Sequence, residues 1–456
     1  MRATREAHMK RLRNGAIPGV LLVLAIATAC VCLSGQTHAA SAAAASATGD
    51  SLREQLGAIG YLDRFEVVAP EDREKCGVTR FETDRASPGV NLFILRTPWS
   101  VVLLDMYGEP VHTMFPDGGA EGWHHVEPLS KGRFLAVHRN HAVLEFASDS
   151  SIRWRTELHA HHDVRLGLLG EIYTLGRRLR RVPRSGGAVF VVDDFIAELS
   201  PDGKIRREIS LLEVFGDCPS LDHFDWKDLW LTRSLYLLRR FIPPQRRFRE
   251  RYDLFHTNSI QVLDRDVEGL CERGDLLISV RNRDLIAVVD PDEERFVWSW
   301  GEGMLDKAHH ATLLDDGNIL IFDNGLSRGW SRVIELNPLT RRIEWEYVGD
   351  PPESFWSRTR GSAQRLPNGD TLITESDRGH VFEVTREGDI VWEYHTPLFQ
   401  EGDDFVRSPI YRMMRYDESI FGQLDRPQSG AEKLPTHSPR ATTPLASSSC
   451  RPTLRK

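Results

Sequence analysis

The chain has few lysines and none of the short motifs that mark the commonest enzyme classes. Only eight of its 58 basic residues are lysine, and the formal net charge is −8, so nothing indicates a nucleic-acid-binding surface. No GxSxG, GxGxxG, glycine-rich phosphate loop or HExxH sequence occurs. Serine-hydrolase, dinucleotide and zinc-protease chemistries therefore have no motif support, and we expect no cofactor.

Cysteine is scarce as well, with six residues in a chain of 456. Cys30 and Cys32 fall in an apolar N-terminal run, and no CxxC pair is present, so we expect no metal site. Cys218 and Cys271 flank the same non-repetitive segment. Either a structural disulfide or plain buried thiols are compatible with this placement.

Residues 1–39 have the pattern of a targeting segment. A basic head that ends at Arg13 is followed by an apolar run from Ile17 to Leu33 and by small residues around Ala39. This pattern is typical of a secretory signal, and an uncleaved membrane anchor is the alternative, because the run approaches the length of a bilayer span. We therefore expect an exported protein, periplasmic or anchored facing the periplasm or exterior, that meets the membrane only through this segment.

The rest of the chain is dominated by one sequence repeat, which consists of an apolar strand, a tight turn and a second strand. Six copies begin at Val101, Ala142, Phe195, Leu285, Val333 and Val381. Tryptophan recurs at one place in four of them, as Trp154, Trp298, Trp345 and Trp392. Turns such as Pro201-Asp202-Gly203 are those of two-stranded hairpins. Self-similarity at a period of about 50 residues in an all-strand unit predicts a β-propeller.

Six copies of the repeat predict an all-β fold: a six-bladed propeller over residues 90–415 with a short helical insertion at about 213–255. A seven-bladed ring is the alternative if flanking segments add strands. Residues 40–89 are expected to form a linker and an irregular lead-in, and residues 416–456 a disordered tail. The first blade has only three strands of its own, so we expect the segment after Tyr394, such as FVRSPIYRMMRY, to supply the fourth and close the ring.

The insertion breaks the repeat with helical spacing of its apolar residues and a dense run of arginines. It is either a lid or basic face at the channel mouth, or a solvated excursion on the rim of the propeller.

A second part of the repeat carries the candidate chemistry. An inner strand pair precedes most hairpins and opens with a polar residue, often a histidine pair such as His309-His310. Inner strands of a propeller begin near one mouth of the channel, so residues at equivalent positions should converge on the axis. Because alternate residues of a strand face opposite sides, at most one member of each pair should point into the channel. Aligning the turns places five residues in register: His125, His162, Ser259, His310 and Ser362.

The order of these segments resembles that of the bacterial aryl-sulfate sulfotransferases, in particular their shorter relatives. The matching stretches are His256 before NSI, then His309-His310, FDNG, and QRLPNGDTLITES followed by GHVFEVTREGDIVWEY. The similarity covers the region from Val90 to Arg415 and is densest after His256. It implies an exported six-bladed propeller that moves a sulfuryl group between phenols without a nucleotide donor, through a sulfated histidine on the axis.

The resemblance also implies catalytic roles for three residues. His256 and His310 match active-site histidines of the family, and Arg328, 18 residues after His310, matches its sulfuryl-binding arginine. An imidazole can attack sulfur as a nucleophile, while other His and Arg groups neutralise the oxygens and protonate the leaving phenolate.

One blade departs from the family pattern. Near the start of its inner strand, where the family has its nucleophilic histidine, this chain reads SRTRGSAQRL. Either Arg358, Arg360 and Ser362 replace the nucleophile, or another ring histidine such as His162 does its work. Arg360 and Ser362, with His125 and His162, are therefore candidate channel-lining residues.

Two functions are compatible with these observations. The first is an arylsulfotransferase-like enzyme with a small aryl sulfate or phenol as its ligand. The second is a catalytically silent propeller that binds a small anion or a partner protein through the same channel mouth.

Overall fold

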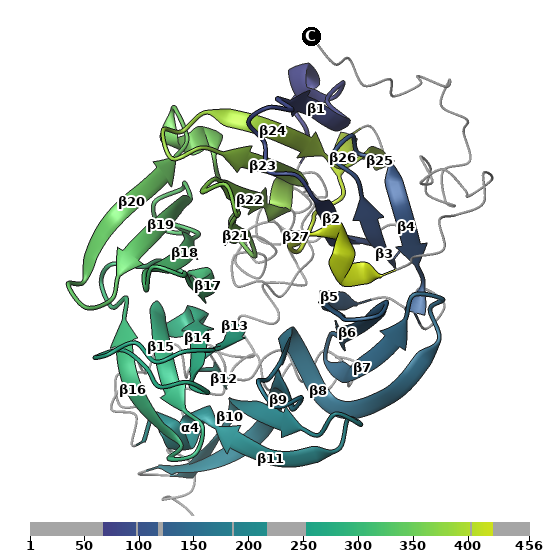
Figure 1. The fold of residues 1–456 in the computed structure, drawn as a ribbon. Coiled ribbons are helices and arrows are strands. Elements are labelled where there is room, and N and C mark those ends of the chain that lie inside the picture. Colours follow the sequence, from purple (N-terminus) through teal and green to yellow (C-terminus); the bar gives the residue numbers. More distant parts are fainter. Residues whose placement is uncertain are drawn as a thin grey trace, which may run out of the picture. The chain divides into compact units, whose positions relative to one another are not determined.

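The computed structural model describes residues 67–96, 99–116, 122–184, 187–216, 252–401 and 404–422. These belong to one compact unit, Asp63–Lys456, and most of them lie in strands and turns. The sheets of this unit follow one another around a central axis, as in a β-propeller (Figure 1). No helix in the described ranges is long and apolar enough to cross a bilayer. The predicted targeting segment, residues 1–39, lies outside them.

Four sheets are separate blades. One contains β13 (Thr257–Val262), β14 (Leu276–Val280), β15 (Leu285–Asp290) and β16 (Arg295–Trp300). The next contains β17 (His309–Leu313), β18 (Ile319–Asp323), β19 (Arg332–Asn337) and β20 (Arg342–Val348). The third contains β21 (Ser362–Arg365), β22 (Thr371–Glu375), β23 (His380–Val384), β24 (Ile390–His395) and an outer strand, β1 (Gly77–Phe81). The fourth contains β27 (Met413–Tyr416), β2 (Val90–Arg96), β3 (Trp99–Leu104) and β4 (Pro110–Met114).

The remaining large sheet is continuous and has eight strands. Its strands are β5 (Trp123–Leu129), β6 (Arg133–His138), β7 (His141–Ala147), β8 (Ile152–Leu166), β9 (Ile172–Arg184), β10 (Gly187–Leu199), β11 (Ile205–Ser210) and β12 (Tyr252–Asp253). Strand β8 has 15 residues and pairs with β7 up to Ala160 and with β9 from His161 onward. The prediction of six separate blades is therefore corrected to four blades and one longer sheet. The reason is that β8 contains no glycine or proline that would end the strand between one sequence repeat and the next.

Both ends of the described chain add strands to distant blades. Strand β27 pairs with β2 from Val90 opposite Tyr416 to Phe93 opposite Met413, which confirms that this segment supplies the missing strand. Strand β1, which the sequence placed in the lead-in, pairs with β24. The ordered chain also continues past residue 415, because Phe421 stacks on Phe134 at 6.1 Å. A small hairpin of β25 (Leu398–Glu401) and β26 (Asp404–Arg407) precedes β27.

The hydrophobic core lies between neighbouring sheets, which explains the continuous apolar runs in the sequence. In β15, Ile286 and Val288 pack in the cluster that contains Ile319 of β18. Their neighbours Ala287 and Val289 pack on the opposite side, in a second cluster. A strand of this kind is buried on both faces, so both sets of alternating side chains must be apolar. Each fully buried valine or isoleucine contributes about 1.5–3 kcal/mol.

The recurring tryptophans lie at equivalent places on outer strands. The indole Nε1 of Trp298 donates to Pro338 O at 3.3 Å, that of Trp345 to Arg386 O at 2.9 Å, and that of Trp392 to Met106 O at 2.9 Å. Each acceptor lies in the last turn of the next blade. The ring of Trp154 packs against Gly203 in the corresponding turn of β10 and β11, where a Cβ would lie 2.4 Å from it. The sequence prediction of one repeated architecture is confirmed.

The predicted helical insertion at 213–255 is described only at its ends, by the short helix α4 (Leu211–Val214) and by β12, and residues 217–251 lie outside the described ranges. Within the described ranges, the 3-10 turns are η1 (Pro70–Asp72), η5 (Arg281–Arg283), η6 (Pro352–Ser354), η7 (Ser376–Arg378) and η8 (Glu418–Phe421). Cys271 is a buried thiol that donates to Arg265 O at 3.7 Å, and Cys218 lies outside the described residues.

Candidate axial site

The inner strands begin with irregular backbone, and this brings functional side chains toward the axis. The pairing register shifts near the start of β5, β13 and β17, and within β8 between His161 and Val164. Non-glycine residues rarely adopt left-handed backbone, and when they do they often mark a functional site. Three residues at or next to these places have a left-handed φ, His162 (62°), His256 (49°) and His310 (47°), and so does Arg360 (59°), shortly before β21.

One group of side chains converges on His162, and we call it the histidine cluster. Its members are His124, His161, His162, His256 and Tyr411. The ring of His162 lies 4.9 Å from the rings of His124, His161 and His256. His124 stacks on Tyr411 at 5.0 Å and accepts a hydrogen bond from the backbone N of His162 at 2.9 Å. The cluster thus joins β5, β8 and the segments before β13 and β27.

The imidazoles of this cluster are neutral at pH 7. Burial holds the pKa of His124, His161 and His162 well below the usual range, and neighbouring cations and histidines lower it further. Burial also lowers the pKa of His256, although Asp253 opposes the shift. The Nδ1 atom of His256 lies 2.6 Å from Asp253 Oδ2, so it donates and leaves the lone pair on Nε2.

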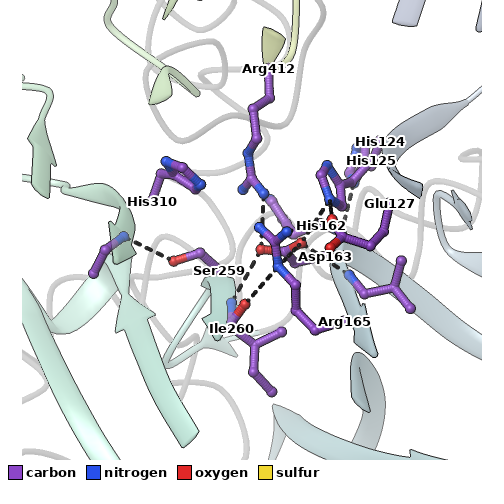
Figure 2. Close-up of polar contacts among 12 residues, drawn as sticks. His124, His125, Glu127, His162, Asp163, Arg165, Ser259, Ile260, His310 and Arg412 are labelled. Carbon is purple, nitrogen blue, oxygen red and sulfur yellow. Dashed lines mark hydrogen bonds and ion pairs between the residues drawn. The ribbon is translucent and has the colours of Figure 1, made fainter. Parts of the chain in front are cut away.

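A second group, the charged cluster, surrounds Asp163 and contains His125, Glu127, Asp163, Arg165 and Arg412. Figure 2 shows Arg412 and Arg165 reaching Asp163 from opposite sides. Arg412 Nη1 lies 3.0 Å from Asp163 Oδ2, while Arg165 Nε and His125 Nε2 each lie 3.5 Å from Oδ1. Arg165 Nη1 also donates to Glu127 Oε2 at 2.5 Å. The two carboxylates and two guanidinium groups balance each other in charge.

Electrostatics keep Asp163 ionised although it is wholly buried. Burial alone would raise the pKa of this carboxyl, but Arg165 and Arg412 hold it well below its usual value. The backbone N of Ile260 also donates to Asp163 Oδ2, at 3.2 Å, and favours the charged form. Asp163 therefore connects β8 to β13 and to the segment before β27.

His310 lies beside the charged cluster (Figure 2) and has one ring nitrogen without a partner. Its Nδ1 lies 2.9 Å from Ala363 O and 3.3 Å from Ala363 N, and we assign the proton to Nδ1 because the shorter contact is to an oxygen that can only accept. Its buried Nε2 makes no hydrogen bond within the described structure. Burial, aided by Arg412, holds the pKa of His310 well below the usual range. A neutral imidazole in this state presents a lone pair on Nε2 and can act as a nucleophile or base.

Three more buried polar atoms near these groups have no hydrogen-bond partner among the described residues: Ser362 Oγ, Tyr411 Oη and Arg412 Nε. Buried polar atoms are nearly always paired, so such a group indicates a place for a ligand or water. A cavity of about 10 Å³ lies beside His124, His125 and Arg412. This is room for about one water molecule.

The two histidines of β5 lie in different clusters. The sequence placed His125 in register with His162; in the structure His124 contacts His162 and His125 contacts Asp163. The physical reason is that bulges at the start of β5 and within β8 insert residues that turn-based alignment does not count. His162 lies within β8, His256 directly precedes β13 and His310 lies at the start of β17, and all three are buried.

Sequence reasoning missed Asp163, Tyr411 and Arg412. Asp163 directly follows the histidine pair at 161–162 and could have been noticed there. Tyr411 and Arg412 precede β27, which carries no histidine signal, so only the ring closure places them at the axis.

The remaining predicted residues lie in salt bridges or in the core. Arg328 Nη1 lies 3.0 Å from Asp323 Oδ2, and its guanidinium stacks over the ring of Trp330 at 4.7 Å. Arg360 Nη1 lies 3.2 Å from Asp377 Oδ1. The family-based role of Arg328 as a sulfuryl ligand therefore stays a prediction.

The solved structures that resemble this chain are distant. They include a protein of unknown function from Bacteroides caccae, with 13% identity, 68% of this chain and 94% of that chain covered, and a TM-score of 0.45. Virginiamycin B lyase from Staphylococcus aureus has 12% identity, 77% and 99% coverage and a TM-score of 0.39. These scores are too low to support an argument about function. No curated protein matches the chain significantly.

The family profile described as arylsulfotransferase (ASST) matches residues 126–397, more than half of the chain. The matched region runs from β5 to just past β24 and includes His162, Asp163, His256, His310 and Arg328. The agreement between this match, the propeller and the axial histidines leads to one conclusion. The chain belongs to the arylsulfotransferase family.

Proposed function

We propose that the protein transfers a sulfuryl group from an aryl sulfate to a phenol at the axial site, without a nucleotide donor. The observation that carries this proposal is the state of His310. Its Nδ1 is held by Ala363 O, and its buried Nε2 has no partner in the described structure. A nucleophile toward sulfur needs a neutral imidazole that is fixed in this way.

The reaction has two steps. In the first, Nε2 of His310 forms a bond to sulfur, the bond from sulfur to the aryl oxygen breaks, and the aryl group leaves as its phenolate. In the second, the oxygen of the acceptor phenol attacks sulfur, the N–S bond breaks, and Nε2 of the neutral His256 takes the acceptor proton. Asp253, 2.6 Å from His256, stabilises the imidazolium that forms, which then passes this proton to the released phenolate.

The sulfuryl oxygens need cationic or hydrogen-bonding partners as charge develops. Arg412 is 5% exposed, lies beside His310 in Figure 2 and has an Nε without a partner in the described structure. We assign the first contact with the sulfuryl oxygens to Arg412, together with the family-matched Arg328. Tyr411 and His124, stacked at 5.0 Å, offer aromatic surface for the aryl ring.

The proposal includes the finer fold and location expected from the sequence. The eight-stranded sheet contributes two inner strands, β5 and the second half of β8, so we count it as two blades of a six-bladed ring. The basic and apolar segment at 1–39 would export the protein, to the periplasm or to a membrane-anchored position outside the cell.

The test is a transfer assay with purified protein, 4-nitrophenyl sulfate and excess phenol. We expect nitrophenol release that depends on the acceptor, a fall of at least about 100-fold in His310→Asn and in His256→Asn, and no change in a control, His112→Asn. His112 lies on β4, where its Nε2 contacts Ser148 O at 2.7 Å. Absence of acceptor-dependent release in the wild-type protein would contradict the transferase proposal. Equal rates in His310→Asn and the control would contradict the role of His310.

A second candidate is a catalytically silent propeller that binds a small anion. It is favoured by Arg412 Nε, which is buried and has no hydrogen-bond partner in the described structure, and by the blade that begins with Arg360 and Ser362 instead of a histidine. Mass spectrometry after exposure to the donor separates the two candidates. A sulfuryl adduct on the peptide that contains His310 supports the enzyme, whereas calorimetric binding without adduct or turnover supports the binder.

A further inference from the structure

A separate cluster of side chains that can bind a metal lies on β23 and β24, in the blade that begins with β21. His380 begins β23, and Glu393 and His395 lie near the end of β24. The antiparallel register places His380 directly opposite His395. Glu393 is two residues before His395, so both side chains leave β24 on the same face. The hairpin thus gathers two imidazoles and one carboxylate on one side.

The donor atoms of these side chains converge. His380 Nε2 lies 3.0 Å from Glu393 Oε1, and His395 Nε2 lies 3.4 Å from the same oxygen. The two rings stack at 4.4 Å with an angle of 6° between their planes. Donor atoms bound to one tetrahedral zinc ion at about 2.0–2.1 Å are about 3.3–3.5 Å apart. The observed separations are close to that spacing.

His395 gives an independent indication of a missing ligand. The residue is 7% exposed, and its Nε2 makes no hydrogen bond within the described structure. This nitrogen lies 3.4 Å from the shared Glu393 oxygen without bonding to it, and a cation bound to both atoms would satisfy it.

The surrounding residues orient the donor atoms. Glu375 Oε2 lies 2.8 Å from His380 Nδ1 and Glu393 Oε1 lies 3.0 Å from its Nε2, so without a cation the ring donates to both carboxylates. A bound cation would replace the proton on Nε2, while Glu375 keeps hold of Nδ1. Thr79 of β1 donates to the other oxygen of Glu393 at 2.6 Å. A carboxylate behind a ligating histidine and a hydrogen bond to the ligating carboxylate are the usual outer partners of a zinc site.

We propose that His380, Glu393 and His395 bind one zinc-type divalent ion, with the fourth position open to water. Two nitrogen ligands and one carboxylate suit zinc and neighbouring transition metals, whereas magnesium prefers oxygen ligands alone. The sequence did not reveal this site, because its ligands come from opposite strands and not from a cysteine motif. Since Glu393 also holds Thr79, the ion would stabilise the attachment of β1 to β24.

The experiment uses the full chain without an affinity tag, stripped with a chelator and titrated with Zn²⁺ in a calorimeter. We expect tight binding of zinc at this site, no comparable binding of Mg²⁺, and a rise in melting temperature of roughly 2–5 °C at saturating zinc. His395→Asn and Glu393→Gln should weaken zinc binding by more than about 100-fold. His141→Asn, an exposed histidine on β7, is the matched control and should bind like the wild type.

The axial histidines are the competing zinc ligands, and His162→Asn tests them. Zinc binding that survives His395→Asn and Glu393→Gln but is lost in His162→Asn would overturn the proposal, as would a wild-type chain that binds no zinc. Binding of Co²⁺ to the unmodified chain provides a measurement that does not depend on the folding of a variant. Visible bands of a four-coordinate ion that disappear when zinc is added support the site, and their absence contradicts it. None of these measurements depends on transferase activity.

Discussion

Replacing Asp163 by asparagine should destabilise the protein strongly, because this buried carboxylate connects several inner strands. It lies on β8, receives hydrogen bonds from Arg412 Nη1 at 3.0 Å and from Ile260 N at 3.2 Å, and lies 3.5 Å from His125 on β5. Asparagine has the same shape and keeps one acceptor oxygen, but it removes the charge opposite Arg412, which is 5% exposed.

Breaking a buried ion pair by removing one partner costs about 3–5 kcal/mol. For a propeller of this size, that loss corresponds to roughly 5–8 °C in melting temperature. Burial acts to raise the pKa of Asp163, but Arg165 and Arg412 outweigh it and hold the pKa well below its usual value. Its stabilising contribution is therefore complete above the unfolded pKa of about 3.9 and is lost only as the pH falls through the lower folded pKa.

The assay is urea unfolding of wild type and Asp163→Asn at pH 7 and at about pH 4. Asp389→Asn is the control, because its partner Arg85 lies 2.8 Å away and both side chains are largely exposed, so it should change stability by less than about 0.5 kcal/mol. Asp163→Asn with Arg412→Met should recover part of the loss, because no unpaired charge remains. A loss at pH 7 no greater than that of the control, or strict additivity in the double variant, would refute the role assigned to Asp163.

Three further predictions concern ring closure, packing and pH. A chain that ends at Arg407 lacks β27 and should melt more than about 10 °C below a control that ends at Gly422, as measured by calorimetry. Phe421→Ala should cost about 3–5 kcal/mol in urea unfolding, because Phe421 is 1% exposed and stacks on Phe134, whereas Ile420→Ala, at a 36% exposed position, should cost less than about 1 kcal/mol. Burial, aided by Asp253, raises the pKa of Asp194 to about 7, so its contribution is present below about pH 4 and lost as the pH rises through 7. Urea midpoints of Asp194→Asn between about pH 4 and 8 should therefore lack the decline that Asp194 causes in the wild type.

The repetitive part of the fold was predictable from the sequence, because each repeat obeys the same local rules. Apolar runs such as that of β15 are continuous since both faces are buried, and Trp298, Trp345 and Trp392 recur because each bonds to the last turn of the next blade. The continuity of β8 was not predictable, since the boundary between two blades there carries no turn signal.

The axial site was predictable only in outline. Histidines at the starts of inner strands indicated where it lies, but bulges decide which member of a pair reaches His162, and turn alignment does not detect them. The Asp163–Arg412 pair joins residues 249 positions apart, and neither residue stands in a recognisable motif. Such contacts arise from closure of the ring and have no local signature.

The order in which the ribosome makes the strands has a consequence for the site. Strand β27 is the last of the described strands to be synthesised, yet it pairs with β2, which is one of the first. Tyr411 and Arg412 directly precede β27, and they contribute to the histidine cluster and to the charged cluster, respectively. A nascent chain can fold individual blades, but it contains neither complete cluster until its final strand arrives. A chain that stops just before Tyr411 thus carries every histidine of both clusters but assembles neither cluster, so the axial site is completed only after the segment up to β27 has been made.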